Sequence, residues 1–228
     1  MKIDVLNKIK GGLIVSCQAL EGEALHGSSI MSKMAIAARD GGAVGIRANS
    51  VKDIKAIKKV VDLPVIGIIK KTYPNSERFI TPTLKEIKQL LDTDVEIIAM
   101  DATLRKQIDS ISLKEKVDYI HAANKLVMAD ISTLEEGIEA DKIGFDLIST
   151  TLSGYTKYSN QNQGPDIKLL SELIKKTNTP IIAEGKIFLE KDLKNVLQEK
   201  PFAIVIGSAI TRPKLITKHY NSIIENFK

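Results

Sequence analysis

The sequence predicts a (β/α)8 barrel, or TIM barrel, in which a closed ring of parallel strands alternates with helices. Eight short apolar runs rich in valine and isoleucine follow one another along the chain, roughly 20 to 35 residues apart, as in repeated βα units. Helix start signals lie between them, and no GxGxxG motif follows the first run. An open doubly wound sheet often carries that motif there and leaves two strand edges exposed. We therefore expect one closed barrel domain over residues 1–228.

The eight apolar runs are nearly unbroken, which is typical of parallel strands buried on both faces. Glycine, proline, asparagine or aspartate bounds each run, as expected for strands. In chain order we expect strands at Leu13–Gln18, Val44–Asn49, Val65–Lys70, Val95–Asp101, Leu126–Ser132, Leu147–Ser153, Pro180–Lys186 and Ala203–Ala209.

The segments between the runs begin with recognisable helix caps. Thr83, Ser112 and Thr133 each precede a glutamate by three residues, the capping-box pattern in which a hydroxyl and a carboxylate satisfy free backbone N–H groups. Ser50 precedes Asp53 in a version with a shorter acidic side chain. Apolar residues then recur at helical spacing, so each helix has one face to pack on the sheet.

Composition narrows the class of ligand. The 228 residues are 43% hydrophobic, which suits one large α/β domain, and 33 basic against 28 acidic residues give a net charge of +5. These charges are scattered and aromatic residues make up only 4%, so a small anion is favoured over nucleic acid. No apolar run approaches the roughly 20 residues of a membrane span. The single cysteine, Cys17, fits a core position and a reducing cytoplasm.

Polar residues end the odd-numbered strands. Active sites of such barrels lie at the carboxyl ends of the strands, where alternate strands supply each layer of inward side chains. The last inward positions of the first, third, fifth and seventh strands are Gln18, Lys70, Asp130 and Glu184. The period of two gives the inward positions below them, which are almost all apolar: Ser16, Ile68, Met128 and Ile182, then Ile14, Ile66, Leu126 and Pro180. A lone lysine at a strand end is commonly just solvated, but four matched polar ends predict a site suited to proton transfer.

The even strands add further polar candidates. Arg47 ends the second strand, and a Thr/Ser-rich stretch, Thr150 to Ser153, ends the sixth. Asp101 ends the fourth strand and could equally cap the following loop. No metal site is predicted, because three histidines lack partners at metal-ligand spacing, namely His26, His121 and His219.

Two glycine-containing turns after the last two strands predict a phosphate site. Gly185 follows Glu184, and Gly207 precedes Ser208, at the place where barrels commonly hold a phosphate on backbone N–H groups. Arg212 follows closely, just before a proline that can open the final helix. We therefore expect a barrel of the phosphate-binding type.

The motifs together resemble a known family. They are SCQAL, GAVGIRAN, PVIGIIKK, IAMDAT, MADIST, TTLSGYT, IIAEGK and IGSAITRP. In order and spacing the chain resembles the bacterial N-acetylmannosamine-6-phosphate 2-epimerases over essentially its whole length. The resemblance implies an enzyme that needs no cofactor and interconverts N-acetylmannosamine 6-phosphate and N-acetylglucosamine 6-phosphate, a step in sialic acid and amino-sugar catabolism.

The resemblance also implies roles for the candidate residues. Lys70 matches the lysine that transfers the C2 proton, and Glu184 matches its partner carboxylate. Gln18, Arg47 and Asp130 match sugar-contacting positions, and Asp130 or Glu184 is expected to help open the sugar ring. The phosphate side is implied to comprise Gly185, Gly207, Ser208 and Arg212.

Two rival functions stay open at this point. A Schiff-base sugar-phosphate aldolase would also use a lysine such as Lys70 at a strand end, as a nucleophile. A module that binds polyanions would use the positive net charge, although aromatic platforms and basic clusters are missing. A homodimer is also possible, because the C-terminal segment has an apolar face that could pack on its own barrel or on a neighbour's, formed by Leu215, Ile216, Tyr220, Ile223 and Ile224.

Overall fold

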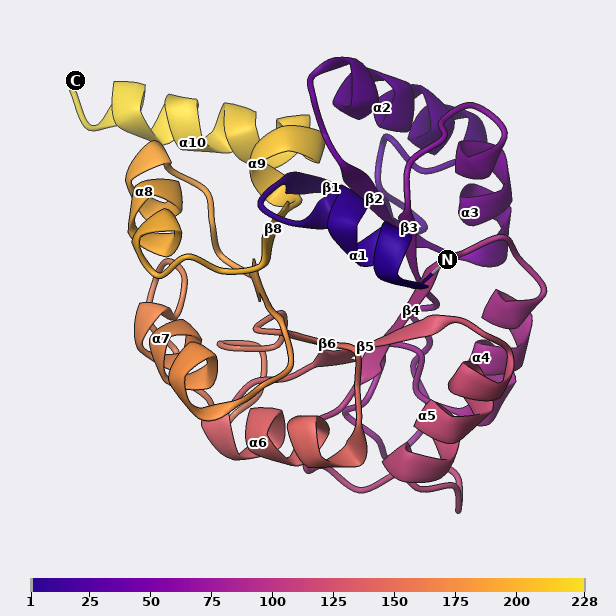
Figure 1. The fold of residues 1–228 in the computed structure, drawn as a ribbon. Coiled ribbons are helices and arrows are strands. Elements are labelled where there is room, and N and C mark those ends of the chain that lie inside the picture. Colours follow the sequence, from indigo (N-terminus) through magenta and orange to yellow (C-terminus); the bar gives the residue numbers. More distant parts are fainter. Residues whose placement is uncertain (1, 228) are drawn as a thin grey trace.

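The computed structural model describes residues 2–227, and within them eight parallel strands form a closed barrel in sequence order (Figure 1). The predicted TIM barrel is therefore confirmed. The strands are β1 (Leu13–Cys17), β2 (Gly45–Asn49), β3 (Val65–Ile68), β4 (Ile97–Asp101), β5 (Leu126–Asp130), β6 (Leu147–Ser149), β7 (Ile181–Glu184) and β8 (Ala203–Ile206).

Helices surround the barrel (Figure 1). They are α1 (Lys2–Ile9), α2 (Ser28–Asp40), α3 (Val51–Lys58), α4 (Leu84–Leu91), α5 (Leu113–Ala122), α6 (Leu134–Ile143), α7 (Ile167–Lys176), α8 (Glu190–Gln198), α9 (Ser208–Thr211) and α10 (Pro213–Glu225). Among residues 2–227, no helix is both long and apolar enough to cross a membrane.

The predicted helix caps form, with one difference. Thr83, Ser112 and Thr133 each make a complete capping box at the start of α4, α5 and α6. Ser50 also caps its helix, because its hydroxyl accepts a hydrogen bond from the backbone N–H of Asp53. The Asp53 carboxylate instead accepts a hydrogen bond from the Ser28 hydroxyl at 2.8 Å. It therefore links the starts of α2 and α3.

Side chains alternate between two separate apolar clusters. The inner cluster includes the predicted inward residues Ile14, Ile66, Ile68, Leu126, Met128 and Ile182. Pro180, also predicted to point inward, precedes β7 and lies outside this cluster. Ile9 of α1 belongs to it, so α1 covers the amino-terminal end of the barrel. Helix α1 was not among the elements predicted from the sequence.

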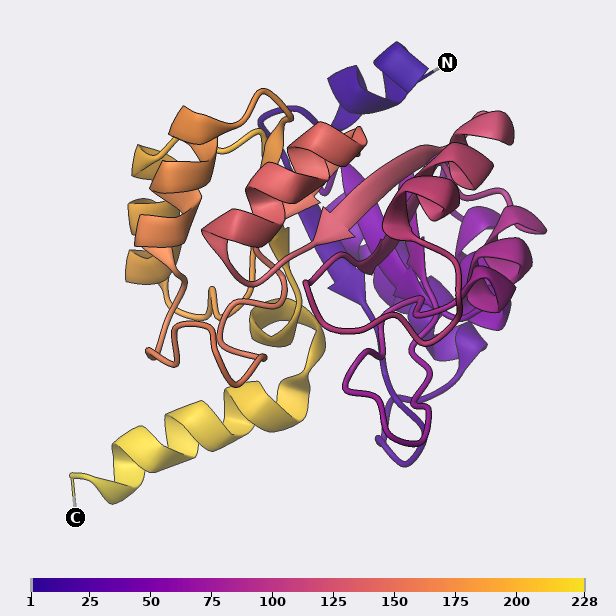
Figure 2. The same cartoon turned by 90° about the horizontal axis from the view of Figure 1, so that it is seen from below.

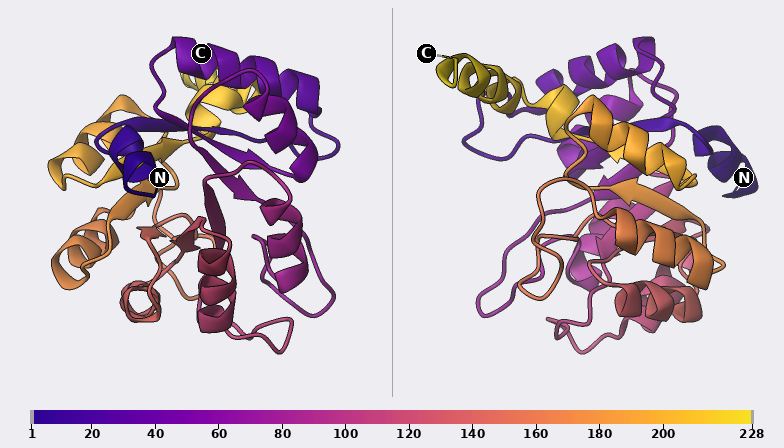
Figure 3. Two further views of the ribbon diagram at one scale, coloured as in Figure 1. Left: turned by 45° about the vertical axis from the view of Figure 1, so that its right-hand side comes forward. Right: turned by 90° about the vertical axis from the view of Figure 1, so that its left-hand side faces the viewer.

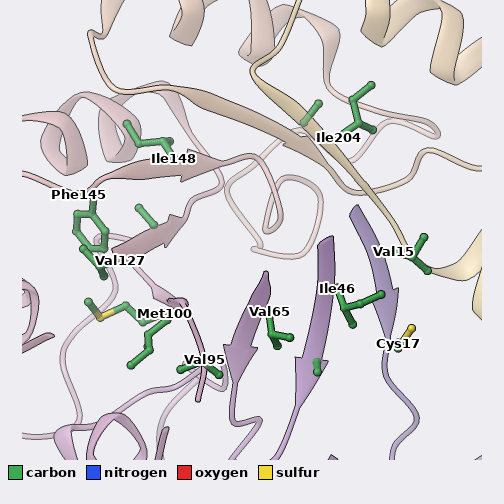
Figure 4. Close-up of a cluster of buried hydrophobic side chains, with 14 of the residues drawn as sticks. Val15, Cys17, Ile46, Val65, Val95, Met100, Val127, Phe145, Ile148 and Ile204 are labelled. Atoms are coloured by element: carbon green, nitrogen blue, oxygen red, sulfur yellow. The ribbon is translucent and has the colours of Figure 1, made fainter. Parts of the chain in front are cut away.

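The outer cluster lies between the strands and the surrounding helices (Figure 4). Cys17 is fully buried there, in one cluster with Val15 of its own strand and Ile46 of the neighbouring β2. Burial raises the pKa of the Cys17 thiol to about 12. The thiol is therefore unreactive at neutral pH, as expected for a core residue.

The final helix leaves the barrel. Helix α10 projects away from the barrel near the carboxyl ends of the strands, and the two termini lie at opposite ends of the molecule (Figures 2 and 3). None of residues 213–225 is buried. The barrel therefore closes without using α10 as a packed outer helix.

Candidate active site

A cavity of about 500 Å³ opens at the carboxyl ends of the strands. Eight of the nine predicted site residues line it: Gln18, Arg47, Lys70, Glu184, Gly185, Gly207, Ser208 and Arg212. Apolar side chains of the inner cluster, Ile68, Ile80, Leu152 and Val205, also line the cavity. Asp130, the ninth predicted residue, does not line the cavity, and its side chain is fully buried.

A buried arginine joins the two predicted carboxylates. Arg47 Nη2 lies 2.5 Å from Asp130 Oδ2, and Arg47 Nη1 forms an ion pair with Glu184. The side chain of Arg47 is 1% exposed, that of Asp130 0% and that of Glu184 13%. Two carboxylates thus share one guanidinium, and only Glu184 presents its carboxylate to the cavity. Arg47 fixes the position of both.

A threonine hydroxyl completes this network. Thr151, just beyond the end of β6, lines the cavity, and its Oγ1 lies 2.7 Å from Asp130 Oδ1 and 3.0 Å from Glu184 Oε2. The Ser149 hydroxyl lies 2.8 Å from Thr151 Oγ1. These two residues were not predicted individually. The Thr/Ser-rich end of the sixth strand was the available signal, but the sequence could not show which hydroxyl faces the carboxylates.

The main chain around Glu184 is held separately. The neighbouring threonine, Thr150, accepts a hydrogen bond from the Glu184 N–H at 3.1 Å and donates one to the Glu184 carbonyl at 2.9 Å. Burial raises the pKa of the Glu184 carboxyl above its usual range, and the Asp130 carboxylate raises it further, against the opposing effect of Arg47. Glu184 can therefore take up a proton nearer neutral pH than an exposed glutamate can.

Lys70 enters the same cavity from the β3 side. Its backbone N–H donates to Asn49 Oδ1 at 2.8 Å, and its main chain pairs with Ile80 in an isolated bridge. Among residues 2–227, no partner forms a hydrogen bond or ion pair with the Lys70 ammonium. Burial, with repulsion from Arg47 and Arg212, lowers the pKa of Lys70 to about 8. The amine is therefore both unbound and able to exchange a proton near neutral pH.

Gln18 lies at the end of β1, as predicted. Its side-chain amide donates a hydrogen bond to the Ser16 hydroxyl at 2.8 Å. Ser16 also lines the cavity, and the strand register places it beside Arg47. The second N–H and the oxygen of the Gln18 amide take no part in that hydrogen bond, so both are available to a polar ligand group.

The predicted phosphate side forms one wall of the cavity. Gly185 has a φ of 104°, a left-handed conformation that favours glycine. Gly207 precedes α9, whose first backbone N–H groups have no partner within the helix. Arg212 Nη2 lies 3.3 Å from a carboxylate oxygen of Glu23, in the loop after β1. Backbone donors and a guanidinium thus face the cavity together, which suits an anion.

Asp101, whose role the sequence left open, has a structural position. Its carboxylate lies 2.6 Å from Arg105 Nη2 and 3.3 Å from Arg78 Nη1, and it accepts the Thr103 N–H at 3.1 Å. Asp101 does not line the cavity. It caps the loop after β4.

Comparison with known proteins decides the family. A family model described as "Putative N-acetylmannosamine-6-phosphate epimerase" matches residues 31–226. The chain belongs to this family of N-acetylmannosamine-6-phosphate epimerases. The resemblance inferred from the motifs is therefore confirmed.

Individual members of the epimerase family match the chain along nearly its whole length. A Clostridium perfringens protein named "Putative N-acetylmannosamine-6-phosphate 2-epimerase" is 55% identical over 221 residues, covering 97% of this chain and 100% of the relative. A protein of the same name from Caldanaerobacter subterraneus is 50% identical over 232 residues, covering 99% and 96%.

A solved structure of a family member has the same fold. The N-acetylmannosamine-6-phosphate 2-epimerase from Clostridium perfringens is 56% identical in sequence and superposes with a TM-score of 0.94, covering 96% of this chain and 95% of that one. The barrel fold is therefore common to this chain and to that epimerase.

Proposed function

We propose that this protein interconverts N-acetylmannosamine 6-phosphate and N-acetylglucosamine 6-phosphate. Family membership gives the reaction. The observation that carries the mechanism is an unbound lysine amine and a buried glutamate lining one cavity that also has an apolar wall. Such a cavity excludes much of the water and strengthens the interaction of charges with the substrate.

The chemistry requires proton transfer at C2. The hydrogen on C2 becomes acidic only when C1 is a carbonyl, so the pyranose ring must open before the proton can leave. Lys70 and Glu184 exchange this proton: one group accepts it from C2 and the other returns a proton to the opposite face. The oxidation state of C2 is the same in both epimers, so the exchange needs no redox cofactor.

The enolate that forms between the two proton transfers carries negative charge on oxygen. Arg47 lines the cavity with a guanidinium, and Gln18 brings an amide, so both are suited to stabilise that charge. For ring opening, the sequence left Asp130 and Glu184 as alternatives. The geometry favours Glu184, because Asp130 is fully buried beneath Arg47 and outside the cavity lining. Asp130 then acts by holding Arg47 in place.

In this proposal, the phosphate of the substrate binds at the wall of the cavity that is formed by the residues after β7 and β8. Backbone N–H groups near Gly185, Gly207 and Ser208 receive its oxygens, and Arg212 supplies charge. The Arg212 guanidinium is also 3.3 Å from Glu23, a partly exposed pair of the kind that contributes little stability. It can therefore release that contact for a phosphate.

The two rival functions are not favoured. A Schiff-base aldolase would use Lys70 as a nucleophile, and borohydride would then trap a sugar phosphate on it. A polyanion-binding module would not need a lysine and a glutamate in one enclosed cavity. Membership of the epimerase family favours isomerisation over both.

Incubation of the protein with N-acetylmannosamine 6-phosphate tests the proposed reaction. The anomeric NMR signals of N-acetylglucosamine 6-phosphate should appear as those of the substrate decline, until a fixed ratio of the epimers is reached. The same ratio should be reached from N-acetylglucosamine 6-phosphate. Unchanged spectra from both directions would refute the proposal. A two-carbon and a four-carbon fragment, from cleavage of the C2–C3 bond, would point to an aldolase.

The exposed helix α10 supports a homodimer. Its apolar residues recur at positions 216, 220, 223 and 224, on one side of the helix. Tyr220, Ile223 and Ile224 are 63%, 42% and 58% exposed, so they do not pack on their own barrel. Of the two possibilities left by the sequence, packing on a neighbouring chain is therefore favoured.

The cellular setting that we propose is a reducing cytoplasm, consistent with a single, buried cysteine.

A further inference from the structure

The hydroxyl of Thr151 lies at the centre of the buried polar network. It lies 2.7 Å from Asp130 Oδ1 and 3.0 Å from Glu184 Oε2. Arg47 Nη1 donates to it at 3.1 Å, and Ser149 Oγ lies 2.8 Å away. Four groups from the ends of β2, β5, β6 and β7 thus meet at one side-chain oxygen.

A single hydroxyl cannot serve both carboxylates at once. It has one proton to donate, and its lone pairs can accept from Arg47 and from Ser149. Arg47 can only donate, and the Ser149 hydroxyl, which could accept instead, is a weaker acceptor than a carboxylate. The Thr151 proton is thus directed to Asp130 or to Glu184. The hydrogen bond to the more negative of the two oxygens is the stronger one. The direction of the Thr151 O–H bond therefore depends on whether Glu184 is ionised.

We propose that Thr151 is a positioning residue whose O–H bond turns between Glu184 and Asp130 as Glu184 gives up and takes up the C2 proton. The inference rests on the proposed function, in which Glu184 changes charge during turnover. The proton of Thr151 stays on its own oxygen throughout, and only the direction of the hydrogen bond changes. Donation to the ionised Glu184 stabilises the carboxylate, and donation to Asp130 leaves the protonated form of Glu184 undisturbed.

Other charged groups also face Glu184. Arg47 from β2 and Asp130 from β5 contact the network directly, and Lys70 acts across the cavity. Lys186 lies two residues after Glu184 in the chain, but its ammonium donates a hydrogen bond to the carbonyl of Asn162 at 2.7 Å. These charges remain in any Thr151 variant, so a substitution there changes only the hydroxyl.

The variants Thr151→Val and Thr151→Ser separate the hydroxyl from the shape of the side chain. Valine keeps the shape and removes the donor to the Glu184 carboxylate, so the pKa of Glu184 in the enzyme should rise. The acidic limb of the plot of kcat against pH should move upward by about one pH unit, the size expected for one hydrogen bond to a charged group. On the acidic limb itself, kcat should fall about 10-fold with little change in KM, and the fall should be smaller on the plateau. Serine should restore the wild-type profile.

A matched control is Thr177→Val, because Thr177 follows α7 directly and, among residues 2–227, its hydroxyl donates only to the helix carbonyl of Leu173. This variant should keep the wild-type limb. If Thr151→Val does not fold, Thr151→Ala removes the same hydroxyl without adding bulk.

An acidic limb that stays in place in the folded Thr151→Val and Thr151→Ala proteins would overturn the proposal. So would a Thr151→Ser enzyme that behaves like the valine variant. A wild-type protein without epimerase activity is a separate outcome, which would refute the proposed function itself.

Discussion

At the scale of single residues, the side chains of Lys70 and Glu184 are held in different ways. The Glu184 carboxylate is fixed by Arg47, which also binds Asp130. The main chain of Lys70 is held by a hydrogen bond from its N–H to Asn49, whereas its side-chain ammonium is not held by a bonding partner within residues 2–227. Inversion at C2 requires proton transfer on both faces of that carbon, and Lys70 and Glu184 are our two candidates for it, because both line the cavity. The carboxylate has a raised pKa and the amine a lowered one, so both can exchange protons near neutral pH.

Replacement of Lys70 by alanine tests its role. Because general acid or base catalysis typically contributes at least about 100-fold, kcat of Lys70→Ala should fall by two or more orders of magnitude. Binding of the sugar phosphate, measured by calorimetry, should persist. Lys71→Ala is the matched control, since Lys71 is the next residue, is exposed and does not line the cavity. Turnover near the wild-type rate in Lys70→Ala would exclude this lysine as the acid or base.

The pH dependence of kcat/KM follows from the same pair, because this ratio reports the protonation of the free enzyme. In the proposed mechanism, the active state holds one transferable proton, either on Lys70 or on Glu184. Below the raised pKa of Glu184 both groups are protonated, and above the Lys70 pKa of about 8 neither is. We expect a bell-shaped plot of kcat/KM against pH that falls above about pH 8. A kcat/KM that kept rising to about pH 10, the ordinary pKa of lysine, would contradict it.

At the scale of elements, local signals were the most predictable. All three capping boxes formed at Thr83, Ser112 and Thr133, because such caps depend on residues only three positions apart. The strands end earlier than expected where polar residues follow, as β3 does at Ile68. Lys70 nevertheless points into the cavity, since the period of two continues beyond the last strand residue.

The contacts of Thr151 were not predictable from local signals. They require β2, β5, β6 and β7 to bring their ends together, over sequence separations of up to 104 residues. The pattern predicted that polar side chains would meet at this end of the barrel. It could not show which of these side chains bonds to which, because the partners depend on how the strand ends pack together.

Gly67 tests the packing of a strand against its helices. An added Cβ would lie 2.6 Å from Val95 Cγ1, 3.1 Å from Ile54 Cδ1 and 3.2 Å from Leu90 Cδ2. Valine is stiff about χ1 and cannot turn aside. Gly67→Ala should therefore lower the free energy of unfolding by about 1–3 kcal/mol, measured by urea denaturation.

Gly137→Ala in α6 is the comparison variant. Its added Cβ would lie 2.1 Å from Cδ2 of the buried Leu173 and at least 3.6 Å from every other atom outside its own helix, so one side chain must move instead of three. Alanine also favours the helix by about 1 kcal/mol over glycine. Gly137→Ala should destabilise less than Gly67→Ala. Equal stability of the wild-type and Gly67→Ala proteins would contradict the packing described for β3.

At the scale of the whole molecule, the barrel was predictable because strand number and spacing allow few closed arrangements. The position of α10 was not. Its apolar face was visible in the sequence, but the same pattern fits a helix packed on its own barrel. The structure separates the two, since none of residues 213–225 is buried.

The oligomeric state tests the use of that face. In light scattering, the wild-type protein should have twice the 25.0 kDa mass of one chain. Ile224→Asp places a charge on the apolar face and should yield monomers at low micromolar concentration. Ser222→Asp adds the same charge on the other side of α10 and should leave the dimer intact. A monomeric wild-type protein, or dimers in both variants, would show that α10 does not join two chains.

The central claim is that the enzyme removes and replaces the proton on C2. Turnover of N-acetylmannosamine 6-phosphate in deuterium oxide measures this directly, with the label located by NMR. The N-acetylglucosamine 6-phosphate formed should carry deuterium at C2, because the returning proton comes from a group that exchanges with solvent. Product formed at the normal rate with only hydrogen at C2 would contradict it.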